Sequence, residues 1–231
     1  MRRLTAALAL GGACVVVTSC TGSTHAPVGA GALDGVLLGP AEIEIAMNAN
    51  GLVNETSTEM SDDSANVPDQ DCRFIDSPVQ TSVYDGSGWL AMRSQYQRES
   101  ADLIHQIWEA VVSFPSAATA ARFFDASARR WSACSNRQYH YINDPGINDP
   151  GTPDTVWTVG RMTDITNTLS VTRGEEGGWA CQRALTVSNN VAVDVAACSV
   201  AASPGGAGVD IAHQIAAKLA KVQDPIQSNS M

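Results

Sequence analysis

The sequence contains few basic residues and no long apolar run beyond its first twenty residues. Lys and Arg number 14 against 24 Asp and Glu, which gives a formal net charge of −10 at pH 7. Because an acidic chain is repelled by phosphate backbones, we do not expect nucleic acid as a partner. No segment after Cys20 approaches 18 consecutive apolar residues, so we expect no transmembrane helix there.

The sequence also lacks the motifs of common enzymes and metal centres. It contains no HExxH pair, no GxSxG elbow, no P-loop, no glycine-rich nucleotide fingerprint and no CxxC pair. The four histidines are scattered, at His25, His105, His140 and His213. We interpret His105 as a strand residue; the alternative is a base in an unrecognised hydrolase. We therefore expect a protein that is not an enzyme, with no catalytic residue, no cofactor and no metal ion.

The N-terminus resembles the signal peptide of a bacterial lipoprotein. Arg2 and Arg3 precede an uncharged, mostly apolar stretch at 4–18, which is too short to cross a bilayer. Val-Thr-Ser-Cys at 17–20 resembles the lipobox, in which small residues admit the peptidase and the thiol of Cys20 carries diacylglycerol. The alternative is an ordinary signal peptide that is cut elsewhere.

This pattern predicts a lipid-anchored, palmitoylated protein on the extracytoplasmic face of the cell membrane, because two or more acyl chains hold a protein there stably. We divide the chain into a signal peptide at 1–19, a flexible tether at 20–36, one domain at 37–223 and a tail at 224–231. The tether assignment depends on the small, polar, Gly- and Pro-containing residues at 21–32. Removal of residues 1–19 leaves 212 residues, a length that suits one domain.

Four cysteines remain after Cys14 and Cys20 are set aside, and they predict two disulfides in an exported chain. The four are Cys72, Cys134, Cys181 and Cys198, for which the count alone allows three pairings.

The segment from Cys181 to Cys198 selects one of these pairings. Its centre is Asn189-Asn190, and asparagine tolerates the positive φ of a two-residue hairpin turn. With Ser188 opposite Val191 as the hydrogen-bonded pair that closes the turn, Cys181 and Cys198 are a non-hydrogen-bonded pair with a Cα separation of about 4.5 Å. A disulfide accepts that separation. We therefore predict a Cys181–Cys198 disulfide, which leaves Cys72 and Cys134 to form the other. Each disulfide should contribute roughly 3–4 kcal/mol to the free energy of unfolding.

Spacing and capping predict several other elements. We expect helices at 40–47, from Ser116 as N-cap through Trp131, and at 209–222. We expect strands at 89–98, 103–113, 155–164 and 166–173, and a loop at 54–70.

The strands at 89–98 and 103–113 predict a hairpin with Arg98 opposite Leu103 and Arg93 opposite Trp108. One face would then carry Trp89, Arg93 and Trp108, which are our candidate ligand-binding residues because a Trp–Arg face can stack on a ligand and attract charge. The alternative is ordinary sheet packing.

Two stretches, taken together, resemble a known family. The first is Val-Val-Ser-Phe-Pro-Ser-Ala-Ala at 111–118, which runs into the helix that carries Trp131 and ends near Cys134. The second is Cys-Gln-Arg-Ala at 181–184, followed by Ser-Asn-Asn-Val at 188–191, Asp194 and Cys198. They resemble the extracellular sensor domain of mycobacterial PknH-type receptor kinases, a domain that stand-alone lipoproteins share. The resemblance extends over residues 37–222.

The resemblance implies an α+β fold with an antiparallel sheet, packed helices, two disulfides and a cleft for a ligand. The sequence departs from the receptor kinases because it shows no kinase domain and no transmembrane helix. We therefore expect capture or presentation of a small or lipidic envelope ligand rather than direct inward signalling. The alternative is a structural lipoprotein that docks another envelope protein.

The lipid anchor gives a first testable prediction. Cys20→Ser should move the protein out of the membrane fraction, because serine has no thiol to acylate. Cys14→Ser is the matched control and should stay in the membrane, because residue 14 leaves with the signal peptide. Fractionation and mass spectrometry of the N-terminal peptide measure both. A mature protein that retains Met1, or a Cys20→Ser variant that stays in the membrane, would contradict the prediction.

Overall fold

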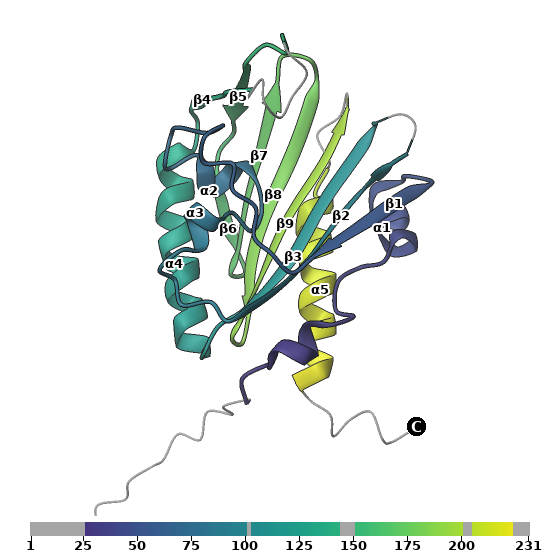
Figure 1. Ribbon diagram of the computed structural model, residues 1–231, viewed down its shortest axis with the longest axis vertical. Helices are drawn as coiled ribbons and strands as arrows, with labels where there is room; N and C mark the ends of the chain where they lie inside the picture. The colour runs from purple at the N-terminus through teal and green to yellow at the C-terminus, as the bar shows by residue number, and fades with distance from the viewer. Residues whose placement is uncertain (1–25, 101–102, 144–150, 201–204, 224–231) are drawn as a thin grey trace, which may run out of the picture.

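The computed structural model describes residues 26–100, 103–143, 151–200 and 205–223, and shows an antiparallel sheet with helices on both faces (Figure 1). The strand order is β1-β2-β3-β9-β8-β7-β5-β4, with β6 paired to β7. This arrangement confirms the α+β class. The strands are β1 Leu52–Ser57, β2 Ala91–Glu99, β3 His105–Ser113, β4 Gln138–Tyr141, β5 Thr155–Val159, β6 Thr163–Ile165, β7 Thr168–Glu175, β8 Trp179–Ser188 and β9 Val191–Val200.

Two hydrophobic cores lie on opposite faces of this sheet. One core contains residues of α4 and of the segment that carries α2 and α3, and the other contains residues of α5, α1 and η1. None of the helices in the described part of the chain is long and apolar enough to cross a membrane. The helices are η1 Ala30–Leu33, α1 Pro40–Met47, α2 Arg73–Asp76, α3 Thr81–Tyr84, α4 Ala117–Cys134 and α5 Ala207–Gln223.

The two long helices follow their local sequence signals. Ser116 caps α4 as predicted, because its hydroxyl accepts a hydrogen bond from the backbone N–H of Thr119 at 3.2 Å. The buried face of α4 includes Ala120 and Trp131, as the spacing indicates, together with Phe123. In α5 the apolar spacing predicts a buried stripe at 211, 215, 219 and 222. Ile211, Ile215 and Leu219 are fully buried, whereas Val222 is 44% exposed at the end of the helix.

The β8–β9 hairpin has the predicted register. Ser188 pairs with Val191 and Cys181 with Cys198, and Asn189 has a φ of 52° in the turn. The Cα atoms of the two cysteines are 3.9 Å apart and their sulfurs are bonded. The other disulfide joins Cys72 to Cys134.

The predicted register of the β2–β3 hairpin is wrong. Arg93 pairs with Val111 and Trp108 with Tyr96, which displaces the pairing by three residues. The connection is longer than four residues because Glu99 closes it with two contacts to His105, from the backbone N–H at 2.7 Å and from ring Nδ1 at 2.6 Å.

Because side chains alternate along a strand, a displacement by an odd number of residues exchanges the two faces. Arg93 and Trp108 therefore lie on opposite faces of the sheet, and the proposed common face does not exist. Trp89 precedes β2 and is 36% exposed.

The loop expected at 54–70 begins with a strand instead. Leu52 to Ser57 form β1, which pairs along its full length with β2 at the sheet edge. Leu52 is its one buried residue, and the polar side chains that follow are exposed. Polar residues are common on edge strands because they discourage pairing with another molecule, so polarity alone did not distinguish this strand from a loop.

The predicted tether at 20–36 ends earlier than expected. Val28, Leu33 and Val36 are buried against the α5 face, and the backbone N–H of Val28 donates to Oδ1 of Asn190 at 2.7 Å. These three apolar side chains attach the segment to the core, although its mostly small and polar composition indicates a flexible tether. The signal peptide with Cys20, the first residues of the tether and the tail at 224–231 lie outside the described residues.

An acidic side chain lies inside the α5 side of the fold. Glu109 is fully buried, and the side-chain amides of Gln95 and Gln97 donate to its Oε1 at 2.8 and 3.3 Å. Burial raises the pKa of Glu109 from 4.5 to about 8, because the charged form loses its hydration. The side chain is therefore mainly protonated at neutral pH.

This pKa predicts a pH dependence of stability. The folded state binds the proton more tightly than the unfolded chain, so the contribution of Glu109 is complete below pH 4.5 and is lost as pH rises to about 8. The loss is up to about 1.4 kcal/mol per pH unit within this window. Glu109→Gln should flatten the pH profile of the free energy of unfolding, measured with urea at pH 5 and pH 8. The exposed-site control Glu55→Gln should keep the wild-type slope; equal slopes in all three proteins would contradict the pKa shift.

Candidate ligand-binding cleft

A cavity of about 380 Å³ opens on the α4 face of the sheet, between the strands and the segment that carries α2. We call it the cleft. Its lining comes from six strands, from Asn143 after β4 and from that segment, so residues far apart in the sequence meet there. They are Asp63, Asp76, Ser77, Pro78, Gln106, Trp108, Tyr141, Asn143, Thr155, Trp157, Arg173, Glu175, Trp179, Cys181, Ala196 and Cys198.

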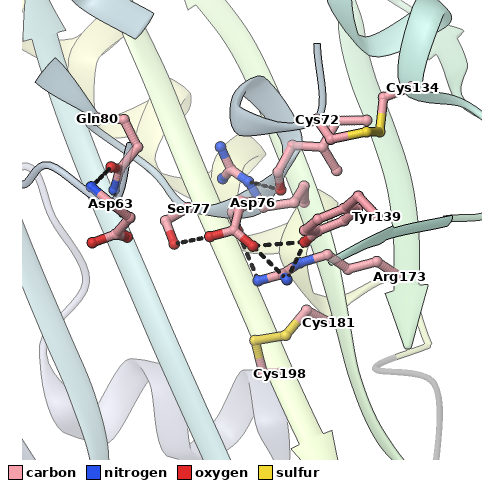
Figure 2. A network of polar contacts seen from close by, with 12 residues as sticks. Asp63, Cys72, Asp76, Ser77, Gln80, Cys134, Tyr139, Arg173, Cys181 and Cys198 are labelled. Carbon is pink, nitrogen blue, oxygen red and sulfur yellow. Dashed lines mark hydrogen bonds and ion pairs between the residues drawn. A yellow bond between two sulfur atoms is a disulfide. The ribbon is translucent and has the colours of Figure 1, made fainter. Parts of the chain in front are cut away.

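The floor of the cleft is the disulfide between β8 and β9. Cys181 and Cys198 both line the cleft, and the Arg173 guanidinium lies between their disulfide and the Asp76 side chain (Figure 2). Ala196, two residues before Cys198 on the same face of β9, also lines the floor. Short side chains at these positions leave a hollow that larger residues would fill.

The roof is the four-residue helix α2 and the residues after it, and a buried ion pair attaches it to the sheet. The Arg173 guanidinium donates to Asp76 Oδ1 at 2.8 Å and to the Asp76 backbone carbonyl at 2.7 Å (Figure 2). Tyr139 donates to the same Oδ1 at 2.6 Å, and Ser77 donates to Oδ2 at 3.0 Å. Asp76 is 2% exposed and Arg173 is 7% exposed, so both charges are removed from water and neutralise each other.

A second buried arginine supports the same roof. Arg183 donates to the backbone carbonyl of Ile75 at 3.0 Å and forms an ion pair with Asp194 at 2.7 Å. Asp194 also accepts from the Tyr84 hydroxyl at 3.0 Å and from the backbone N–H of Val79 at 3.1 Å. The carbonyls at the end of α2 thus find donors on the sheet, which a helix end inside the protein requires.

The disulfide between Cys72 and Cys134 completes the attachment. It joins the residue before α2 to the last residue of α4. The roof is therefore fixed on both sides, to the sheet by two arginines and to α4 by a covalent bond.

Aromatic side chains form the walls of the cleft. The Arg173 guanidinium lies 3.8 Å from the centroid of the Trp157 ring, and Trp108 packs edge-on against Tyr96 with ring centroids 6.0 Å apart. Trp179 lines the cleft as well. Burial raises the pKa of the Tyr141 hydroxyl to about 12, so this group is a neutral donor at physiological pH.

Asp63 supplies a carboxylate at the far end of the polar row in Figure 2. Gln80 holds it from two directions, since its Nε2 donates to Asp63 Oδ2 at 2.9 Å and its Oε1 accepts from the Asp63 backbone N–H at 2.6 Å. Burial, reinforced by the charge of Asp76, raises the pKa of Asp63 above its usual value.

The residues proposed from the sequence are divided between different parts of the molecule. Trp108 lines the cleft, whereas Trp89 does not. Arg93 lines a separate cavity of about 500 Å³ and forms an ion pair with Asp34 at 2.6 Å. His105 is a strand residue, as expected, and its partner is Glu99.

Sequence reasoning missed four central residues, Asp76, Arg173, Trp157 and Trp179. A signal for the arginine was present, because Arg173 lies in the strand Thr168–Glu175, where apolar residues alternate toward one core. A charged residue at a buried strand position needs a partner. Its partner, Asp76, lies 97 residues earlier in a polar segment, and no local pattern identifies it.

The arrangement can hold a ligand between aromatic walls, a polar roof and an apolar floor. The described residues contain no group of three or more histidine, cysteine, aspartate or glutamate side chains placed to hold a metal ion. The side chains that line the cleft can contact a ligand by stacking, hydrogen bonding and charge.

Comparison with known proteins gives consistent matches. Residues 28–218 match the family model described as the PknH-like extracellular domain. The chain is 30% identical over 204 residues to the serine/threonine-protein kinase PknH of Mycobacterium bovis, an alignment that covers 87% of this chain and 32% of the kinase. It is 32% identical over 197 residues to PknH of Mycobacterium tuberculosis, covering 84% of this chain and 29% of the kinase. The chain thus spans about a third of the length of these relatives.

A solved structure shows the same fold. The crystal structure of the extracellular domain of PknH from Mycobacterium tuberculosis superposes with a TM-score of 0.77 at 30% identity, and the match covers 85% of this chain and 99% of that one. The matched region thus has the fold of that extracellular domain.

The buried ion pair of the roof predicts that two aspartates near α2 contribute unequally to the free energy of unfolding. Asp76→Asn leaves the Arg173 charge buried without a counter-ion and should lower the free energy of unfolding by about 3–5 kcal/mol. Asp71→Asn removes the exposed pair with Arg130 and should cost less than about 1 kcal/mol. Urea unfolding monitored by tryptophan fluorescence measures both. Equal losses would show that the buried pair does not hold the roof.

Proposed function

Because the chain belongs to the family of PknH-like extracellular domains, we propose that it is a sensor-like, ligand-binding domain of a cell-envelope lipoprotein. In this proposal Cys20 carries the lipid anchor and the domain lies on the extracytoplasmic face of the membrane. The cleft captures a small or lipidic envelope ligand, or presents it to a partner, without catalysis.

The proposal depends on a cavity that lies beneath a roof fixed to the rest of the fold. A loop segment that only had to cover the sheet could collapse onto it with apolar side chains. Here two buried arginines, Arg173 and Arg183, and the Cys72–Cys134 disulfide support the segment above a cavity of about 380 Å³. Its volume is in the range of small-molecule sites, which are concave, largely aromatic or apolar, and largely pre-formed.

The family also supports this proposal. The solved relative is the extracellular domain of PknH, and the match covers 99% of it. In this proposal the domain recognises a ligand, and the kinase chemistry of the relatives belongs to the two thirds of their length outside the match.

The test uses the lipoprotein purified from its own membranes. Native mass spectrometry should show a bound small molecule on the wild-type protein. Trp179→Ala should reduce the occupied fraction at least tenfold, because the variant removes one aromatic wall of the cleft. Trp89→Ala is the matched control: the same substitution at a tryptophan outside the cleft should leave the occupied fraction unchanged.

Two results would contradict the proposal. One is an equal effect of the Trp179 and Trp89 substitutions on occupancy. The other is an empty cleft combined with stoichiometric crosslinking to one envelope protein in cells, which would favour the docking alternative.

A further inference from the structure

The described residues that line the cleft include more acidic than basic side chains. The described lining residues include three carboxyl groups, those of Asp63, Asp76 and Glu175, and one cation, Arg173. Arg173 is already paired with Asp76, and each neutralises the other. Two carboxyl groups therefore remain without a counter-charge in the lining.

Asp63 is fixed in place near a second acid. Gln80, which is 2% exposed, holds it by two hydrogen bonds, and the strongest charge that acts on it is that of Asp76. No described lysine or arginine forms an ion pair with Asp63. Burial raises the pKa of Asp63, and the neighbouring charge of Asp76 raises it further, which agrees with a carboxyl group that has no cation beside it.

The walls beside these carboxyl groups suit a cation as well. Trp108, Trp157 and Trp179 line one cavity with Asp63, and the face of an indole ring attracts an ammonium or guanidinium group. The protein itself uses this interaction once in the cleft, where Arg173 lies 3.8 Å over Trp157. Aromatic rings combined with carboxylates are the general means by which proteins recognise quaternary ammonium groups.

We infer that the ligand of the cleft is an organic cation, an amine or quaternary ammonium group on an apolar body, with Asp63 as its counter-ion. This inference rests on the proposed ligand-binding function and specifies its ligand class. An anionic ligand would face two carboxyl groups and an arginine whose charge is already neutralised. A free metal ion would find no group of three metal-ligating side chains among the described residues.

The test compares three head groups on one apolar chain. The probes are octyltrimethylammonium, octanoate and octyl glucoside, each below its micelle concentration, titrated into the wild-type protein by calorimetry. We expect the cation to bind at least ten times more tightly than octanoate and than octyl glucoside. Its affinity should fall at high salt, because the attraction is electrostatic.

A conservative variant measures the contribution of the Asp63 charge to the affinity for the cation. Asp63→Asn keeps an oxygen that accepts the hydrogen bond from Gln80, so the roof should fold normally, which a thermal unfolding curve checks. We expect this variant to bind octyltrimethylammonium at least tenfold more weakly. Asp125→Asn, the same change at an exposed position of α4 outside the cleft, should bind it as the wild type does.

The outcomes separate this inference from the proposed function. Octanoate or octyl glucoside binding as tightly as the cation would overturn the inference and leave a ligand-binding cleft intact. Unchanged cation affinity in Asp63→Asn would also overturn it. Binding of none of the three probes would count against both the cationic ligand and the cleft as a binding site.

Discussion

The buried contact between Arg173 and Asp76 holds the α4 side of this fold together. The segment between β1 and β2 crosses the α4 face of the sheet with only two four-residue helices of its own, which are too short to be stable alone. Its backbone carbonyls need donors, and the sheet provides them through the guanidinium groups of Arg173 and Arg183. The two arginines come from the adjacent strands β7 and β8, so this part of the sheet positions the roof.

This support explains why a cavity exists where an ordinary core would be expected. Buried ion pairs are costly because both charges lose their hydration, and an apolar replacement of equal volume is often as stable. A roof held by apolar packing, however, would fill the space above the Cys181–Cys198 disulfide. A roof held by directional hydrogen bonds to Asp76 and Ile75 can remain above it, so the ion pairs keep the hollow open.

The sequence predicted those parts of the fold that local interactions determine. The β8–β9 hairpin, with Cys181 opposite Cys198, follows from its two-residue turn, and α4 follows from Ser116 and the apolar spacing. The β2–β3 register could not be predicted, because Glu99 closes a longer connection through its side chain. The cleft was even harder to predict, because Asp76 and Arg173 are 97 residues apart and no local pattern around Asp76 identifies it as the partner that Arg173 needs. Trp108 was identified as a candidate, but its predicted companions depended on the wrong register.

The central claim is that Asp76 and Arg173 act on the roof as a pair, and a double-mutant cycle measures this most directly. The free energy of unfolding is determined by urea for the wild type, Asp76→Asn, Arg173→Met and the double variant. We expect a coupling energy of about 2 kcal/mol or more, in the upper part of the range for residues in contact. Single effects that add to the double effect within about 0.5 kcal/mol would contradict it, because additivity is the behaviour of independent sites.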